Sequence, residues 1–208
     1  MKAGLDAAGV RLRLRSPGRP VGVRGSGSVR GDHDLNPDLR PPSRLIPAAV
    51  LVPIVDRLEG LTVLLTRRTA HLASHAGQIS FPGGRIEPDD LDPESAALRE
   101  TEEEVGLGRD FVELAGRLDT YQTRTGYEIT PVVGLVSPAF RLRLDPHEVA
   151  AAFEVPLDFL LDPTNHQRSH RIDVGGIKRE FWAMPYGEHF IWGATAGMLV
   201  NLYEVLGR

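Results

Sequence analysis

The chain has no cysteine among its 208 residues, so it can form neither a disulfide bond nor a thiolate nucleophile. No apolar run approaches the roughly 18 residues that a membrane-spanning helix needs. The N-terminus also lacks the apolar core of a secretory signal. These absences predict a protein that crosses no membrane and works in the reducing cytoplasm.

Positive charge is scarce outside the N-terminal segment. Residues 1–44 carry nine Lys/Arg and four Asp/Glu, whereas the remaining residues carry 15 and 24. An acidic main body argues against a general nucleic-acid-binding protein. The length allows one domain with a sizeable core.

Residues 1–44 are rich in Gly, Arg and Pro and show no sustained hydrophobic periodicity after a possible short strand at 10–14. This composition favours a flexible extension. Two other interpretations stay open: an arm over the active site, and an Arg-rich organelle transit peptide. We place the domain boundary after residue 44, so that the folded domain covers residues 45–208.

The sequence DPESAALRETEEEVG predicts a short acidic helix. Asp92 suits the N-cap, Pro93 the first helical position and Gly106 the C-terminal stop. At about 100° per residue, apolar positions fall in one arc and should pack inward. These positions are Ala97, Leu98, Thr101 and Val105.

Glu100, Glu103 and Glu104 fall in the adjoining arc of this helix, at spacings of three and four residues. Like charges at these spacings repel, and carboxylates in the last turn also face the negative end of the helix dipole. A hard divalent cation such as Mg²⁺ would make each of these interactions favourable. A solvated acidic face is the alternative interpretation for three glutamates taken alone.

The rest of the chain alternates strand-like and helical segments. Together they predict an α+β fold in which a mixed sheet lies between helical layers. We expect strands at 47–55, 61–66, 111–120 and 127–136, short helices at 146–152 and 157–161, a hairpin of 172–174 with 177–184, and an amphipathic helix at 194–206.

The acidic helix belongs to a longer pattern that resembles the signature of the Nudix hydrolases, G-x5-E-x7-R-E-U-x-E-E-x-G-U, where U is aliphatic. The right-hand half matches as RETEEEVGL. The left-hand half is one residue too long after Gly84, so that no Glu occupies the early acidic position. Asp90 or Asp92 is the candidate to replace it. The resemblance implies the Nudix α/β/α sandwich.

The preceding segment, LLTRRTAHLASHAGQISFPGG, resembles the additional motif of the coenzyme A pyrophosphatase branch, roughly LLTxRxxxLxxHxGQIxFPGG. Gly77 and Gln78 belong to this motif. The two motifs together cover residues 64–107. The segments at 148–163 and 190–202 are also similar to this branch.

The Nudix resemblance implies Glu100 and Glu104 as the principal ligands of Mg²⁺ or Mn²⁺, with Glu103 as a further ligand or as the general base. It implies that Arg99 orients a carboxylate through a bidentate pair. Glu148 is either a base or extra ligand, or simply a glutamate at a helix start.

Gly83 and Gly84 are expected to let the backbone approach the metal or phosphate closely. Arg67, Arg68 and Arg124 are candidates for binding the 3′-phosphate of coenzyme A, with a solvated surface role as the alternative. Aromatic residues such as Phe181 and Trp182 could stack an adenine or pack in the core. His71 and His75 have a zinc-compatible spacing but no third ligand nearby.

The predicted function is metal-dependent hydrolysis of the diphosphate of coenzyme A or its derivatives. Two alternatives are a Nudix hydrolase acting on ADP-ribose or NADH, and a non-catalytic nucleotide-binding domain. The sequence predicts a small-molecule partner and neither a nucleic acid nor a membrane, and it leaves a homodimer possible.

Overall fold

The structure is a computed structural model that describes residues 5–15, 29–70 and 76–207. Its main feature is a nine-stranded sheet. Six strands form the path β1-β7-β8-β2-β3-β4, while β5 pairs with β2, β6 with β8 and β9 with β3. The strands are β1 (Val29–Gly31), β2 (Ile46–Arg57), β3 (Gly60–Arg68), β4 (Ile79–Ser80), β5 (Gly83–Arg85), β6 (Val112–Arg117), β7 (Thr120–Gln122), β8 (Tyr127–Val136) and β9 (Val149–Pro156).

This sheet is mixed. The long strands β2 and β8 run parallel over ten residue pairs, from Ile46–Tyr127 to Val55–Val136. Strand β2 forms an antiparallel hairpin with β3, as the sequence predicts. A smaller antiparallel sheet contains β10 (Gln167–Ile172), β11 (Lys178–Tyr186) and β12 (His189–Trp192).

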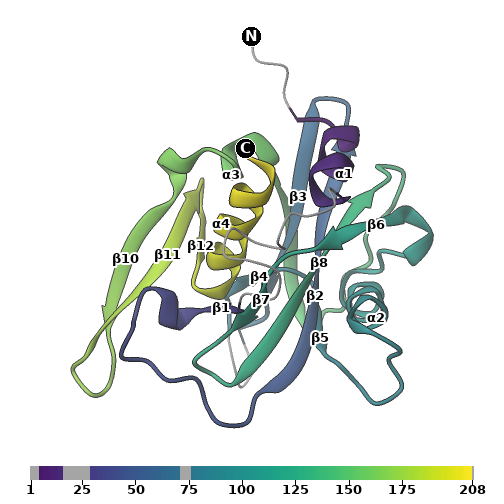
Figure 1. Cartoon of the computed structure of the whole chain (residues 1–208). Helices are drawn as coiled ribbons and strands as arrows, with labels where there is room; N and C mark the ends of the chain where they lie inside the picture. Colours follow the sequence, from purple (N-terminus) through teal and green to yellow (C-terminus); the bar gives the residue numbers. More distant parts are fainter. Residues whose placement is uncertain (1–4, 16–28, 71–75, 208) are drawn as a thin grey trace.

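The large sheet is covered on both faces, as Figure 1 shows. Helix α2 (Pro93–Val105) lies on one side, and α4 (Ala194–Leu206) lies on the other with the small sheet. Neighbouring residues of β2 serve different cores because strand side chains alternate between faces. Leu51 packs with the α2 residues, and Val52 packs with the α4 residues. The predicted mixed sheet between helical layers is therefore confirmed.

The expected strand at 10–14 is wrong, because these residues belong to helix α1 (Ala7–Arg15). Alternating Arg and apolar residues suggest a strand here. However, Ala7, Val10 and Leu14 also recur at helical spacing. Val10 is fully buried in the core that includes α4, with Ala7 and Leu14 packed against it.

The expected helix at 146–152 is also wrong. Residues 146–148 form a turn, and β9 starts at Val149. The run of alanines favours a helix locally, but antiparallel pairing with β3 gives these residues strand hydrogen bonds instead. The helices expected at 157–161 and 194–206 are confirmed as α3 (Leu157–Leu160) and α4. The strand expected at 111–120 is divided into β6 and β7.

The segment before residue 45 contributes structure to the domain. Strand β1 pairs in parallel with β7 and leads into a short 3-10 turn, Asp32–Asp34. Asn36 is buried and joins this segment to β11, because its side-chain amide donates to the Glu180 carbonyl at 3.0 Å and its amide oxygen accepts the Glu180 N–H at 2.9 Å. The division of the chain at residue 44 remains a prediction.

No helix in the described part of the chain is long and apolar enough to cross a membrane.

Candidate active site

Helix α2 begins and ends where the sequence predicts. Asp92 is the N-cap: its carboxylate accepts the Ser95 N–H at 2.7 Å, and the Ser95 hydroxyl oxygen accepts the Asp92 N–H at 2.9 Å. Gly106 ends the helix with φ of 69°, a left-handed conformation that suits glycine. These caps fix the register that carries the glutamates.

The inward face of α2 is also as predicted, since Ala97, Thr101 and Val105 are fully buried. Because residues three and four positions apart share a face, Glu100 and Glu104 lie at the edge of this buried arc. Glu100 and Glu104 both line a cavity of about 600 Å³, the large cavity of the protein, whereas Glu103 does not line it.

Glu104 is the most buried carboxylate of the helix, with only 5% of its side chain exposed. It accepts the Gly83 N–H at 3.3 Å and lies 3.5 Å from an Arg68 Nη. Burial raises the pKa of Glu104 to about 7, against the lowering effects of Arg68 and the Gly83 N–H. The charges of Glu148 and Glu100 raise this pKa further.

Gly83 makes this contact possible. Its φ of 147° is rarely adopted by L side chains, and an added Cβ would lie 2.4 Å from the Ala49 carbonyl oxygen. Only glycine therefore fits where β5 pairs with β2 and directs its N–H toward Glu104.

Glu100 is held against Gly84. A Cβ added to Gly84 would lie 2.4 Å from the Glu100 carboxyl carbon, so the missing side chain provides the space for this carboxylate. Burial raises the pKa of Glu100, and its pairing with Arg99 partly offsets that effect. The expected close approach of Gly83 and Gly84 thus brings backbone to carboxylates.

Arg99 joins helix α2 to the acidic loop that precedes it, which contains Asp90. Its Nη2 lies 2.9 Å from Asp90 Oδ2 and its Nε 3.1 Å from Asp90 Oδ1, a bidentate pair. The other Nη group contacts Glu100 at 3.0 Å and Glu103 at 3.1 Å. Arg99 lowers the pKa of Asp90. The structure therefore places Asp90 as the bidentate partner of Arg99, while Asp92 caps the helix.

Glu148 reaches the same cavity from the turn before β9. Its carboxylate lies 3.8 Å from an Arg68 Nη, so Arg68 stands between Glu104 and Glu148. Of the two interpretations of Glu148, the glutamate at a helix start is wrong, because residues 146–148 form a turn that leads into β9. A role of Glu148 as a base or extra ligand stays a prediction.

The remaining candidate residues lie farther from this group. Glu103 is 61% exposed at its side chain and pairs with Arg99. Arg67 is exposed and does not line the cavity, whereas Gln78 does. Gly77 lies in an exposed turn with φ of 69°. His71 and His75 fall outside the described residues.

The cavity has a volume of about 600 Å³, within the range of about 300–1,000 Å³ that is usual for ligand sites. The carboxylates Glu100, Glu104 and Glu148 line one part of it. The rest is lined by residues of the large sheet, of the start of α4, of the small sheet, of the β7–β8 connection and of the segment before residue 45. Asp32 and Asn36 were not predicted as site residues, because nothing in the local sequence places that segment against β11.

The donor set fits a hard divalent cation. Carboxylate oxygens are the ligands that Mg²⁺ and Mn²⁺ prefer, and Glu104 is a buried acid whose pKa lies near neutrality for want of a fully compensating charge. In the described residues the acidic side chains do not form a ready-made group of three metal ligands. Arg68 and Arg99 occupy their oxygens instead.

Comparison with known proteins gives the family. The sequence model described as "NUDIX domain" matches residues 45–173, and the chain belongs to the Nudix hydrolase family. A relative, the "uncharacterized Nudix hydrolase NudL" of Escherichia coli K12, is 43% identical over 163 residues that cover 77% of this chain and 82% of the relative. The protein of the same name from Shigella boydii serotype 18 has the same identity and coverage.

Among solved structures, a MutT/nudix family protein from Enterococcus faecalis is similar in fold. Its TM-score is 0.51 at 19% identity, with 82% of this chain and 65% of that chain covered. At this identity the similarity concerns the fold alone.

Proposed function

We propose that the protein is a Mg²⁺- or Mn²⁺-dependent diphosphohydrolase that cleaves coenzyme A or its derivatives to 3′,5′-ADP and 4′-phosphopantetheine or its acyl form. The observation that carries the hydrolase assignment is that Glu100, Glu104 and Glu148 all line the large cavity, and that the charges of Glu100 and Glu148 act on the buried Glu104. Three carboxylates so placed are costly without a cation to neutralise them.

Glu100, Glu104 and Glu148 are the residues that would hold the cation. When bound, the cation would neutralise the diphosphate and acidify a nucleophilic water. Arg68 and Arg99 now balance these carboxylates, so we expect their contacts to loosen when the metal enters. Gly83 and Gly84 keep the backbone close to Glu104 and Glu100.

The general base is assigned to Glu103 or Glu148. Glu148 already lines the cavity. Glu103 does not line the cavity and is paired with Arg99, so this ion pair would have to open for Glu103 to act as the base. Because Glu103 is exposed and held by a single helix-surface pair, this opening costs on the order of 0.5 kcal/mol.

The choice of substrate rests on the similarity of residues 64–84 to the coenzyme A pyrophosphatase motif. Arg68 and Gln78 of this segment line the cavity, which supports a role of the motif in ligand binding. The resemblance to this motif is what favours coenzyme A over ADP-ribose and NADH.

Mass spectrometry after incubation with Mg²⁺ and each of coenzyme A, ADP-ribose and NADH tests the proposal. Conversion of coenzyme A to 3′,5′-ADP and 4′-phosphopantetheine, lost on EDTA addition, is expected. Faster hydrolysis of ADP-ribose or NADH would contradict the substrate but keep the hydrolase. Nucleotide binding without turnover of any substrate, measured by calorimetry, would contradict the hydrolase itself.

A further inference from the structure

The part of the cavity away from the glutamates is formed by one face of the small sheet. In antiparallel strands, directly paired residues project to the same face. The pairs Arg171–Arg179 and Ala183–Trp192, together with period-two alternation along β11, place Arg171, Arg179, Phe181 and Trp192 on one face. All four line the large cavity.

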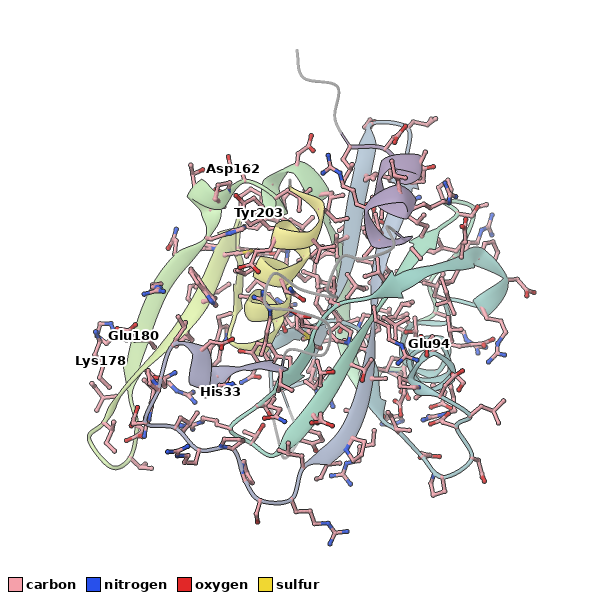
Figure 2. All side chains as sticks on the ribbon, viewed as in Figure 1. His33, Glu94, Asp162, Lys178, Glu180 and Tyr203 are labelled. Atoms are coloured by element: carbon pink, nitrogen blue, oxygen red, sulfur yellow. The ribbon has the colours of Figure 1, made fainter. Side chains whose placement is uncertain are left out.

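The opposite face has a different role. Met184 and Ile191 from this face are buried in the core with α4. Lys178 and Glu180 lie on it too, and Figure 2 shows them at the outer side of the small sheet. They pair with each other at 3.0 Å. Of these opposite-face residues, Glu180 also lines the large cavity, whereas Lys178, Met184 and Ile191 do not.

Of the two arginines on the cavity face, only Arg179 is neutralised. It lies 2.8 Å from Asp38 and 3.2 Å from Asp173. Arg171 has no carboxylate within ion-pair distance among the residues that the structure describes. An arginine without a counter-charge at the wall of a cavity is suited to bind a phosphate.

Two aromatic rings adjoin this guanidinium. The Arg171 Cζ lies 5.4 Å from the centroid of the Trp192 ring, and the Phe181 and Trp192 centroids are 5.1 Å apart. Nucleobases bind by stacking on aromatic side chains, whatever the base, because every base has a π-face. A nucleobase and a phosphate therefore find complementary groups side by side.

Two further arginines line the cavity without a carboxylate partner among the described residues. Arg85 belongs to β5, next to the Gly84 that lies against Glu100, and its Nη2 donates to the Tyr127 hydroxyl at 3.2 Å. The other is Arg124. Its backbone N–H donates to Asp32 at 2.8 Å, and the same Asp32 carboxylate accepts the Tyr121 hydroxyl at 2.9 Å. Arg124 follows β7, no aromatic ring lies under its guanidinium in the described residues, and its neighbour Asp32 is an acid that lines the cavity too. Arg171 is thus the better phosphate partner.

We propose that Arg171, Trp192 and Phe181 form a nucleotide-specificity site for an adenosine that carries a second phosphate on its ribose. The base packs against the aromatic pair, and the ribose phosphate pairs with Arg171. This inference rests on the proposed function, since it assigns the 3′,5′-ADP half of the substrate to this wall and the diphosphate to the glutamates. Arg171 and Trp192 are binding residues and take no part in the chemistry.

Calorimetric binding of 3′,5′-ADP and 5′-AMP to the full chain in EDTA tests this site without turnover. The wild type should bind 3′,5′-ADP more tightly than 5′-AMP. A charged hydrogen bond contributes about 1.5–3 kcal/mol, or about 10- to 100-fold in affinity. Arg171→Ala should therefore weaken 3′,5′-ADP binding by that factor and leave 5′-AMP binding within about twofold.

The chain offers a matched control on the same strand. Arg168 lies over the Trp182 ring with its Cζ 5.2 Å from the centroid, but neither residue lines the large cavity. Arg168→Ala should change neither affinity. Trp192→Leu should weaken both nucleotides by a similar factor of about ten, because each has the same base.

Failure of the specificity site and failure of the proposed reaction give different results. Equal wild-type affinities for the two nucleotides, or a selective loss in Arg124→Ala rather than Arg171→Ala, would overturn the site whatever the enzyme hydrolyses. If coenzyme A is not hydrolysed but the Arg171-dependent preference for 3′,5′-ADP is seen, the proposed reaction fails and the specificity site stands.

Discussion

Glu104 is the carboxylate of the candidate site whose pKa is shifted most by its surroundings. Its carboxylate is buried, its pKa is raised to about 7 by that burial, and its neighbours Glu100 and Glu148 add negative charge. Such an acid is destabilising in a protein that binds no cation. Its position beside Gly83 and Arg68 is instead suited to bind an ion that carries the diphosphate.

Glu104→Gln should lower kcat by about 10²-fold or more, because it removes a charged ligand at the site of developing negative charge. Glu102, exposed on the same helix and absent from the cavity, supplies the control, and Glu102→Gln should leave kcat unchanged. Steady-state kinetics with Mg²⁺ measure both. Equal turnover of the two variants would remove α2 from the reaction.

Glu103→Gln gives a separate test of the general base. A base or metal ligand at this position predicts a loss of about 10²-fold in kcat. A change of less than threefold would leave Glu103 only as a partner of Arg99 and move the base to Glu148.

Gly84→Ala should reduce activity with little effect on folding. The added Cβ would meet the end of the Glu100 side chain, at 2.4–2.6 Å, and this flexible group can move aside. A displaced ligand costs about 10²-fold in rate. For Gly108→Ala, the nearest atom is 3.9 Å away, so no loss is expected. Measuring kcat and Tm for both variants separates a loss of activity from a loss of stability. A Gly84→Ala protein with full activity would show that Glu100 does not need its present position.

Asp90→Asn tests the link between Arg99 and the acidic loop. The pKa of Asp90 is lowered in the folded state, so its charge contributes stability above the ordinary carboxyl pKa of about 4. That contribution is lost as the pH falls through the lowered folded-state pKa. The variant should lose about 1–3 kcal/mol at pH 7, and the difference from wild type should shrink in acid. Urea unfolding at pH 7 and pH 3 measures this; a difference that is independent of pH would contradict it.

At the scale of elements, the site depends on contacts that join the segment before residue 45 to the small sheet. Asn36 donates to the carbonyls of Asp32 and Glu180, at 2.7 and 3.0 Å. These bonds place Asn36 and Asp32 beside β11 at the cavity wall. The arrangement of β11 and therefore of Phe181 rests partly on this short segment.

Asn36→Asp should weaken both folding and substrate binding. A carboxylate cannot donate to the two carbonyls, so we expect about 2 kcal/mol of destabilisation and a raised KM. Asn165 is the control: its side-chain amide donates to the Phe159 carbonyl at 2.9 Å, away from the cavity. Asn165→Asp should lower Tm without changing KM. Thermal unfolding and kinetics separate the two effects, and an unchanged KM in Asn36→Asp would contradict the role of this segment.

Elements defined by local signals were predictable from the sequence. The α2 helix has its cap, first-turn proline and terminal glycine in the chain itself, and the β2–β3 hairpin has two apolar runs around a short turn. By contrast, β9 and α1 depend on distant partners. Pairing with β3 overrides the alanines of β9, and packing in the α4 core selects helix for 7–15.

The site was predictable where one helix carries it. Spacing places Glu100, Glu103 and Glu104 in one arc of the helix, and the resemblance to the Nudix signature implies Glu100 and Glu104 as the principal ligands. The close approach of Gly83 and Gly84 is expected because they immediately precede this signature or begin it. The sequence left Asp90 and Asp92 as alternatives, and only the conformation of the loop before α2 identifies Asp90 as the partner of Arg99. The position of Trp192 at the cavity wall could not be predicted without the register of the small sheet. The same register places Phe181 at the cavity and Trp182 on the opposite face.

At the scale of the whole molecule, one cavity is enclosed by parts that are far apart in the chain. Helix α2 and Glu148 supply acidic groups, the small sheet supplies aromatic and guanidinium groups, and the N-terminal segment closes the wall between β7 and β11. Asp32 and Glu180 add acidic groups on the side of the small sheet, where Arg171 is the basic group that the proposed nucleotide site requires. The central claim is that the acidic end binds the catalytic cation.

Crystals grown with Mn²⁺ and 3′,5′-ADP, measured at an anomalous wavelength, test that claim most directly. The account predicts an anomalous peak about 2.0–2.4 Å from carboxylate oxygens of Glu100 and Glu104, and its loss in Glu104→Gln crystals but not in Glu102→Gln crystals. A wild-type structure with the nucleotide bound and no anomalous peak at these carboxylates would contradict it.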